Sequence, residues 1–442
     1  MSLTNPPSGA SGPDPTDRGI GPIGYQSKVR VIDKYKVVGF ISSGTYGRVY
    51  KALGRQGQPG EFAIKKFKPD KEGEQITYTG ISQSAVREMA LCSELNHGNV
   101  IKLIEIILED KCIFMVFEYA EHDLLQIIHH HTQQPRHPIP PTTIKSIMFQ
   151  LLNGCQYLHS NWVLHRDLKP ANIMVTSAGE VKIGDLGLAR LFYKPLHSLF
   201  SGDKVVVTIW YRAPELLLGS RHYTPAIDMW AVGCIFAELL SLRPIFKGEE
   251  AKMDSKKTVP FQRNQMQKIV DVMGVPNKER WPFLPNMPEF SQLQTLQTPL
   301  TGHGHQPHHH SHGAGQPGAS KSHLEKWYYS TISQGSGSGT SSPAPGTANS
   351  LASLGAEGYK LLAGLLEYDP EKRLTAAQAL QHSFFSTGDR VSVNCFEGLK
   401  MEYPHRRVSQ DDNDIRTSSL PGTKRSGLPD DSLVPRKKVR EA

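Results

Sequence analysis

The chain has 442 residues, of which 38% are hydrophobic, and it carries 15 tyrosines, 16 phenylalanines and 5 tryptophans. This content supplies a large core and excludes wholesale disorder. The formal net charge of +8 is weak support for direct nucleic-acid binding. The longest apolar run near the middle, from Met229 to Ala237, is far too short to span a membrane. We therefore expect an intracellular protein without membrane or direct nucleic-acid partners.

The composition divides the chain into segments. Residues 1–34 are rich in Pro, Gly and Ser at their start, and we predict that they form a disordered extension. From Tyr35, segments such as "YKVVGFISSGTYGRVYKALG" and "EFAIKKF" alternate β-branched or aromatic residues with glycines, which is typical of hairpin-connected strands. A helix is predicted in "SAVREMALCSELN", followed by two more strands in "VIKLIEII" and "KCIFMVFEY".

Helical periodicity dominates beyond residue 120, in "PTTIKSIMFQLLNGCQYLHS", "TPAIDMWAVGCIFAELLS", "QRNQMQKIVDVMG" and "GYKLLAGLLE". It is interrupted at about 298–350 by a Gly-, His-, Ser- and Pro-rich insert. We expect this insert to be a loop whose removal, over about 302–345, costs little stability. Its histidines lack Cys or carboxylate partners, which favours polar filler over a metal site. Residues 386–442 are predicted to be a polar tail ending in a basic cluster, "PRKKVR".

The segment "SSGTYGRV" lies between two predicted strands and contains Gly44 and Gly47. Glycines at such a turn let backbone N–H groups approach phosphate closely. Ser42 stands where a G-x-G-x-x-G pattern has its first glycine, and a Gly-rich hairpin is by itself more often only a turn. This motif alone is therefore a weak indication of a nucleotide site.

Lys65 lies on a predicted strand, where a lysine is more often a solvated edge residue. Glu88 on the following helix changes that interpretation, because its carboxylate can hold the ammonium towards nucleotide phosphates. The pair is the second part of a candidate site.

The decisive segments are "VLHRDLKPANIMV" and "VKIGDLGLAR". In phosphoryl transfer a protein cradles phosphates, holds metal ions and aligns a hydroxyl near a carboxylate. Asp167 is placed to accept the hydroxyl proton, Lys169 to meet the transferred phosphate, and Asn172 and Asp185 to bind Mg²⁺. "WYRAPE" follows with Glu215, 30 residues beyond Asp185. So many motifs in this order make an accidental match very unlikely.

From Tyr35 to Phe385, apart from the insert, the chain resembles the eukaryotic protein kinases. The resemblance implies an α+β bilobal fold, with a small antiparallel-sheet N-lobe carrying one regulatory helix (about 35–119) and a mostly helical C-lobe (about 120–385). It implies ATP in the cleft between the lobes, with Phe117 as the gatekeeper, Glu118 to Ala120 as the hinge and Asp123 as the ribose contact. The other residues that it implies for the lining are Ile41, Ser42, Val49 and Ala63. It also implies that Glu215 pairs with Arg373 and that Asp228 braces the catalytic loop.

Narrower features are similar to the cyclin-dependent kinases: "SQSAVRE", where these kinases have their cyclin-contacting helix, and "VVVTIWYRAPELLLG" in the activation segment. This similarity implies Pro-directed Ser/Thr substrates, with Val207 and Arg212 shaping the pocket after the phosphoacceptor. "YAEHDLLQII" and "SRHYTPAIDMWAVGCIFAELL" resemble the Mediator-complex group, in a fungal version. That group implies a C-type cyclin, Mediator kinase-module subunits, the RNA polymerase II C-terminal domain as substrate, and the nucleus. "PRKKVR" reads either as solvated tail or as a nuclear import signal, which we favour.

Two positions depart from the family pattern. Leu186 replaces the usual Phe of D-F-G, but an apolar residue still fits that slot. Asp203 occupies the place of a phosphorylatable Thr, opposite the three arginines that the resemblance gathers at the anion site, namely Arg87, Arg166 and Arg190. Asp203 is either a partial substitute for phosphate or a solvated carboxylate, in which case a partner's acidic residue fills the site. Both interpretations stay open.

A kinase-fold scaffold without catalysis is the alternative to an active enzyme. Pseudokinases usually lack the strand lysine, the catalytic Asp or the metal-binding Asp. The chain retains Lys65, Asp167, Asn172 and Asp185, and these residues favour the active kinase.

Overall fold

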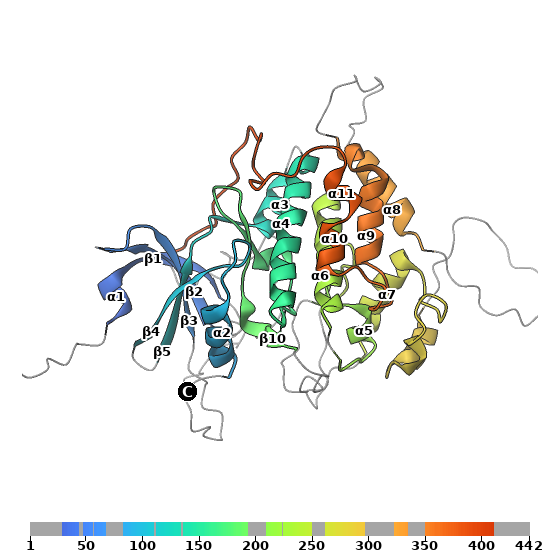
Figure 1. Ribbon diagram of the computed structural model, residues 1–442, viewed down its shortest axis with the longest axis horizontal. Coiled ribbons are helices and arrows are strands. Elements are labelled where there is room, and N and C mark those ends of the chain that lie inside the picture. Colours follow the sequence, from blue (N-terminus) through green and yellow to red (C-terminus); the bar gives the residue numbers. More distant parts are fainter. Residues whose placement is uncertain are drawn as a thin grey trace, which may run out of the picture.

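The structure is a computed structural model that describes residues 29–43, 47–55, 57–67, 83–109, 112–133, 136–192, 209–222, 224–249, 261–296, 322–334 and 350–410. Two lobes are visible in Figure 1: a twisted sheet with one helix against it, and a larger bundle of helices. The predicted α+β bilobal fold is confirmed.

The N-lobe sheet has the strand order β1-β2-β3-β5-β4, and every neighbouring pair is antiparallel. Consecutive residues of β3 are buried on opposite faces: Ala63 belongs to the main core, whereas Ile64 belongs to a smaller cluster with Tyr35 and Val116. Because side chains alternate along a strand, both faces of the sheet are therefore covered. The strand bounds are β1 (Tyr35–Ser43), β2 (Gly47–Gly54), β3 (Glu61–Phe67), β4 (Leu103–Glu109) and β5 (Cys112–Glu118).

The C-lobe is organised around α6 (Ala226–Ser241), which is buried along nearly its whole length. A helix that is apolar all round belongs at the centre of a domain. The other main helices are α2 (Gln83–Glu94, in the N-lobe), α3 (Leu124–Thr132), α4 (Pro141–Ser160), α5 (Pro214–Leu217), α7 (Arg263–Met273), α9 (Gly355–Leu365), α10 (Ala376–Leu380) and α11 (Ser383–Ser386). Short strands and 3-10 turns complete it: β6 (His122–Asp123), β7 (Val163–Leu164), β8 (Ile173–Val175), β9 (Val181–Ile183), β10 (Arg190–Leu191), η1 (Pro170–Asn172), η2 (Leu186–Leu188), η3 (Leu284–Asn286), η4 (Phe290–Thr295) and η5 (Leu351–Leu354).

The extension predicted to be disordered over 1–34 ends earlier than expected. Val31–Lys34 forms a helical turn, α1. The Val31 side chain is buried with Tyr35, and its backbone N–H donates to Glu109 Oε2 at 2.8 Å. Burial of an apolar side chain against the open face of the sheet orders this turn. Residues 1–28 lie outside the described part of the chain.

The insert at 298–350 is not only a loop. Residues Leu324–Gln334 form α8, which contacts α6, α7, α9 and η5. Leu324, Tyr328 and Ile332 are buried, and the Tyr328 hydroxyl donates to the Gly355 carbonyl at 3.0 Å. These residues recur every four positions, as one buried face of a helix requires. The expectation that removing 302–345 costs little stability assumed that the insert contributes nothing to the core. That assumption is wrong for the part that contains α8.

The tail predicted over 386–442 begins as ordered chain. From α11, residues 387–410 run along the helical lobe and reach β1 of the sheet, as Figure 1 shows. Cys395 and Tyr403 are buried, and the Cys395 N–H donates to the Gly179 carbonyl at 2.9 Å. The basic cluster at 436–440 lies outside the described residues.

Within the described ranges, no helix combines the length and the apolar character that crossing a membrane demands.

Replacement of Tyr328 by Ala should test the packing of α8. The side chain is fully buried, so Tyr328→Ala should lower the free energy of unfolding by about 3 kcal/mol through lost contacts and a residual cavity. Tyr329→Ala is the matched control, because the Tyr329 side chain is 38% exposed. Equal melting temperatures for the two variants would show that α8 does not contribute to the core.

Candidate active site

Lys65 on β3 lies at the centre of an ion-pair network between the lobes. Its Nζ is 2.7 Å and 2.8 Å from the two carboxylate oxygens of Glu88 on α2, and 2.9 Å from Asp185 Oδ1. Burial alone would lower the pKa of Lys65, but the charges of Asp185 and Glu88 outweigh it and raise the pKa. The ammonium is thus held charged, with its carboxylate partners supplied by α2 and the Asp-Leu-Gly segment.

Asp185 has a left-handed backbone, with φ at 53°, and its carboxylate is 46% exposed while Oδ1 contacts Lys65. The next residue, Leu186, is buried in the main core. This agrees with the expectation that Leu fills the slot of the usual Phe. The charge of Lys65 lowers the pKa of Asp185 to about 2, against the opposing effect of burial.

The catalytic loop brings Asp167, Lys169 and Asn172 together. Lys169 Nζ donates to Asp167 Oδ2 at 2.6 Å. The Asn172 amide NH₂ donates to the Asp167 carbonyl at 2.8 Å and to Asp167 Oδ2 at 3.0 Å. The sequence prediction placed these three side chains in one site, and the structure places them within hydrogen-bond distance.

Asp228, at the start of α6, holds the backbone of the catalytic loop. Its carboxylate accepts the backbone N–H groups of His165 at 2.9 Å and Arg166 at 2.8 Å, and His159 Nε2 donates to it at 3.0 Å. Burial alone would raise the pKa of Asp228, but these donors lower it. The predicted bracing role therefore has a direct geometric basis.

His165 was not singled out from the sequence. It is fully buried, and its Nδ1 accepts the Asp167 backbone N–H at 3.2 Å while Nε2 donates to the Gly184 carbonyl at 2.8 Å. The ring therefore links the catalytic Asp to the residue immediately before Asp185. Its position in "HRD", next to Arg166 and Asp167, was the available signal.

The predicted nucleotide-binding residues line one region between sheet and hinge. In register, Val49 on β2 is opposite Lys65, Ser42 on β1 is opposite Val49, and Ala63 is opposite Phe117. Gly47 begins β2, and Ile41, Ala63, Phe117 and Ala120 are buried. Gly44 lies outside the described residues.

Two of the predicted hinge-region side chains also have structural partners. Glu118 Oε1 accepts the Lys102 backbone N–H at 2.8 Å and lies 3.2 Å from Lys182 Nζ. Asp123 is the N-cap of α3 and accepts the Gln126 N–H at 2.9 Å through Oδ1. A ribose contact by Asp123 would therefore use a carboxylate that is already oriented by the helix.

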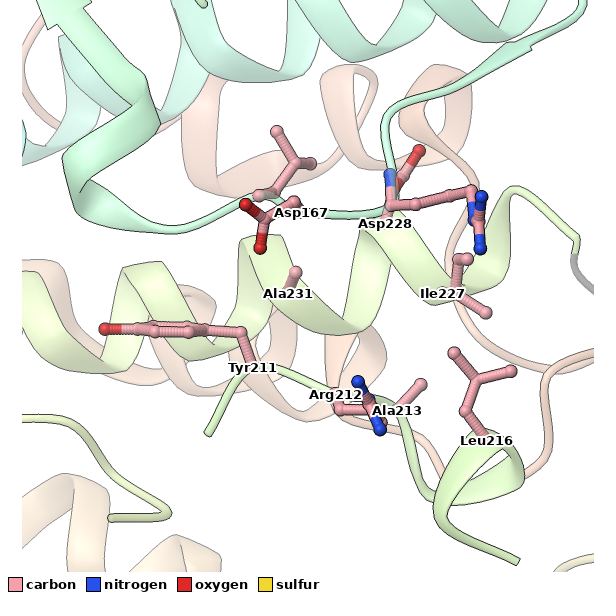
Figure 2. Close-up of a pocket in the computed structure, with 10 residues that line it drawn as sticks. Asp167, Tyr211, Arg212, Ala213, Leu216, Ile227, Asp228 and Ala231 are labelled. Carbon is pink, nitrogen blue, oxygen red and sulfur yellow. The ribbon is translucent and has the colours of Figure 1, made fainter. Parts of the chain in front are cut away.

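A pocket lies beneath the catalytic loop, between Asp167 on one side and Leu216 and Ile227 on the other (Figure 2). Arg212, predicted to shape the pocket after the phosphoacceptor, lines it, whereas Val207 is outside the described residues. Tyr211 also lines the pocket, and its hydroxyl donates to the buried Glu238 at 2.6 Å. Burial raises the pKa of Glu238 to about 7.

The anion site stays a prediction, but the structure describes its three arginines. Arg190 on β10 is paired in register with Leu164, two residues before Arg166, and Arg166 Nη1 donates to the Leu188 carbonyl at 3.2 Å. Arg87 lies on α2, which packs against η2. Asp203 is outside the described residues.

The predicted pair of Glu215 and Arg373 is present and buried. Two parallel bonds join them, Nη1 to Oε1 at 2.8 Å and Nη2 to Oε2 at 3.0 Å. This bidentate geometry is the strong form of the arginine–carboxylate interaction. It ties α5, whose Leu216 lines the pocket beneath the catalytic loop, to the body of the C-lobe.

The residues predicted to hold Mg²⁺ have suitable donor atoms. Asp185 has an ionised carboxylate that is 46% exposed. Asn172 donates both of its hydrogen bonds to Asp167 through its NH₂ group, which leaves the amide oxygen as the ligand-type atom. Elsewhere in the described ranges, no three His, Cys, Asp or Glu side chains gather as a metal site. One Asp and one Asn suit Mg²⁺, which usually completes its coordination with phosphate oxygens and water.

The sequence profile of the protein kinase domain matches residues 35–385. The chain belongs to the protein kinase family. The kinase is 83% identical over 431 residues to the serine/threonine-protein kinase SSN3 of Chaetomium globosum, which covers 97% of this chain and 84% of that protein. It is 70% identical over 501 residues to the protein of the same name in Pyricularia oryzae, covering both chains completely. It is 68% identical over 420 residues to the protein of the same name in Aspergillus terreus, and the alignment covers 95% of this kinase and 92% of that protein.

These findings confirm the predicted serine/threonine protein kinase and its similarity to fungal kinases. The protein kinase domain also implies ATP as phosphate donor.

Substitution of Lys65 should show whether its charge is needed for phosphoryl transfer or only for the stability of the strand. We expect Lys65→Met to lower the phosphoryl-transfer rate roughly a hundredfold or more, because the preorganised ammonium is lost from the phosphates. Lys66→Met is the matched control: the neighbouring side chain points to the other face, where its ammonium lies 5.4 Å from the centre of the Phe114 ring. Transfer rates and melting curves of both variants check this, and an active, folded Lys65→Met protein would contradict the assignment.

Proposed function

We propose that this kinase transfers the γ-phosphoryl group of ATP to Ser or Thr residues followed by Pro, in proteins of the transcription machinery. The observation that carries the catalytic part is that Lys65 binds Asp185 while Lys169, which binds Asp167, is near enough for its charge to act on Asp185 as well. These residues serve positioning and charge stabilisation, which is what phosphoryl transfer requires of a protein.

In this mechanism Asp167 orients the substrate hydroxyl and takes its proton, while Lys169, 2.6 Å from Asp167, meets the transferred phosphoryl group. Lys65 contacts the inner phosphates. Asn172 and Asp185 would hold Mg²⁺, which would supply positive charge to neutralise the phosphates. The paired arrangement of Lys65 and Glu88 supports an active kinase over the alternative of a kinase-fold scaffold.

We propose a C-type cyclin as the activating partner, bound at α2 and β4. Val86 on α2 is 50% exposed, and Ile104 and Leu108 on β4 are exposed as well. Exposed apolar side chains on neighbouring elements are a feature of protein interfaces. Since Glu88 already pairs with Lys65 in the chain, such a partner would stabilise this arrangement of α2 against alternatives rather than create it.

We further propose membership of the Mediator kinase module, the RNA polymerase II C-terminal domain as a substrate, and nuclear localisation. The support is the motif similarity of the sequence and the basic cluster at 436–440.

Nuclear accumulation of a fluorescent fusion should fall when residues 436–440 are removed. If the shortened fusion still accumulates fully in the nucleus of cells that lack the partner subunits, this cluster is not the import signal.

Activity should depend on the cyclin. On a Ser-Pro peptide from the polymerase repeat, the purified chain alone should be at least roughly tenfold slower than its complex with a C-type cyclin. Val86→Asp should reduce activation by the cyclin, because a charge is placed in an apolar contact. Val393→Asp, at a side chain that is 82% exposed on the C-terminal segment, is the matched control. High activity of the chain alone would refute the dependence.

The activation segment should need no separate activating kinase. We propose that an acidic side chain, from Asp203 or from a partner, compensates the charges of Arg87, Arg166 and Arg190. Asp203 supplies about one negative charge where a phosphothreonine supplies roughly 1.5 to 2, so on its own it is a partial substitute.

Phosphatase treatment of the cyclin complex should therefore leave its activity intact. Asp203→Ala should lower the rate if Asp203 is the anion and leave it unchanged if a partner acid is. The Asp203→Thr variant should reach the activity of the unmodified complex only after the new threonine is phosphorylated. Complete loss of activity on dephosphorylation of the unmodified complex would overturn the proposal.

A further inference from the structure

The described part of the C-terminal segment ends against the edge of the N-lobe sheet. Ser409 forms an isolated antiparallel bridge with Phe40 of β1. Its N–H donates to the Phe40 carbonyl at 2.8 Å, and its carbonyl accepts the Phe40 N–H at 2.7 Å. Gln410 Nε2 donates to the Val38 carbonyl at 2.9 Å. Because β1 is an edge strand, its outer side offers backbone groups for such pairing.

The contact at Ser409 is close and uncharged. Only 9% of Ser409 is exposed. A Cβ added to Gly39 would lie 2.6 Å from the Ser409 carbonyl oxygen and 2.7 Å from Val408 Cγ1, so this approach of the two chains requires a glycine. The facing β1 residues Val38, Gly39 and Phe40 carry no charge. A charged group at residue 409 would therefore find no counter-charge on the strand that it faces.

The residues before Ser409 form a distinctive charge pattern. Arg406 and Arg407 are the only two consecutive arginines in the chain, and they stand three and two positions before Ser409. Protein kinases select substrates partly by such charge patterns, and guanidinium groups bind an acidic substrate groove through charge-assisted hydrogen bonds. The residue after Ser409 is Gln410. The Pro-directed specificity proposed above therefore does not predict that this kinase modifies Ser409 itself.

The end of the segment can open without unfolding the rest. Upstream, the buried Tyr403 hydroxyl is hydrogen-bonded to His131 Nε2 at 2.8 Å, and the Cys395 N–H donates to the Gly179 carbonyl at 2.9 Å. These contacts fix the segment to the C-lobe independently of β1. A short stretch held by few contacts opens locally far more often than the whole domain unfolds. Such opening presents Ser409 and the arginines before it as an extended peptide.

We propose that Ser409 is a phosphorylation site for an arginine-directed Ser/Thr kinase, and that its modification releases the end of the C-terminal segment from β1. In this reaction Ser409 Oγ attacks the γ-phosphorus of ATP bound to that kinase. The bond from the γ-phosphorus to the β–γ bridging oxygen breaks, ADP leaves, and the hydroxyl proton passes to the catalytic carboxylate of that kinase.

Release follows from the charge of the new group. A phosphoserine carries roughly 1.5 to 2 negative charges. Burial of a charge is strongly unfavourable without a partner, and β1 supplies none at this contact. The modified Ser409 therefore stays in water and its bridge to Phe40 does not re-form, while Tyr403 remains bound to the C-lobe.

The site is tested on the full chain carrying Asp167→Ala, which removes its own transferase activity. The probe is the catalytic subunit of the cyclic-AMP-dependent protein kinase, an arginine-directed enzyme, with ATP, and the phosphate is located by mass spectrometry. Ser409 should be phosphorylated, and Ser409→Ala should abolish the signal at that peptide. Replacement of Arg406 and Arg407 by Gln should slow the reaction at least roughly tenfold. Absence of phosphate from Ser409 would overturn the proposal.

An acid-directed casein kinase is the comparison enzyme, because Asp411 and Asp412 follow the site in the sequence. It should modify Ser409 more slowly than the arginine-directed enzyme. A faster reaction with the acid-directed kinase would overturn the assignment to an arginine-directed one.

Two glycine substitutions test whether β1 protects Ser409. Gly39→Ala displaces the segment, because its Cβ would overlap the Ser409 carbonyl, whereas a Cβ on Gly98 meets nothing within 4 Å and Gly98→Ala is the matched control. Gly39→Ala should speed phosphorylation of Ser409 roughly threefold to tenfold, since the open state is more populated. Equal rates in the two variants would contradict a site that is covered by β1. Melting curves of both variants exclude general unfolding as the cause.

Hydrogen exchange tests the release. The Phe40 and Ser409 amides should exchange at least roughly tenfold faster in the phosphorylated chain, because their mutual bonds are lost. The Cys395 amide should be unchanged, since its bond to Gly179 belongs to the part that stays on the C-lobe. Ser409→Ala treated with the same kinase should keep slow exchange at Phe40. Unchanged exchange at Phe40 in the fully phosphorylated chain, or equal acceleration at Cys395, would refute local release.

Discussion

The charge of Lys65 is the constraint on which the arrangement of the two lobes depends. An ammonium group that is largely removed from water is strongly unfavourable unless carboxylates surround it. Here the carboxylates come from α2 and from the Asp-Leu-Gly segment, so satisfying one side chain of β3 places both elements. The left-handed backbone of Asp185 and the burial of Leu186 follow from the same requirement, since the carboxylate must point to the cleft while its neighbour fills the core.

The lower half of the site is organised by a second buried carboxylate. Within the described part of the chain, Asp228 is satisfied by two backbone N–H groups and an imidazole N–H. This network determines the path of the backbone through Arg166, whose φ is 70°. Such a conformation is unfavourable for a residue with a side chain and persists where the surroundings fix it. The buried pair of Glu215 and Arg373 does the same for the segment beside the pocket beneath the catalytic loop.

The sequence was sufficient for those parts of the site whose residue types are dictated by chemistry at fixed spacing. Lys65, Asp167, Asn172 and Asp185 could be predicted because phosphate, metal and hydroxyl each demand a particular group. The supporting ring of His165 was harder to find, because its role is visible only once Gly184 lies beside it.

Composition was a poor guide where a short ordered element lies within a polar region. Leu324, Tyr328 and Ile332 have helical spacing, but the Gly- and His-rich residues on either side concealed it. The C-terminal segment at 403–410 has no periodic pattern at all. Its order comes from individual contacts, such as Tyr403 with His131 and Ser409 with Phe40, between residues far apart in the chain. Local sequence carries no record of such pairings.

The contact between Gln410 and Val38 joins residues 372 positions apart, which has a consequence for the order in which the molecule is completed. During synthesis the N-lobe strands leave the ribosome first, and Ser409, the backbone partner of Phe40 on β1, is made much later. A loop of this length would be costly to close in an unfolded chain. Once the lobes have folded, however, their own packing has brought the two ends near each other, and only a few residues remain to be ordered. The edge of β1 therefore stays open throughout translation, and its closure is a late and local step rather than part of the folding nucleus.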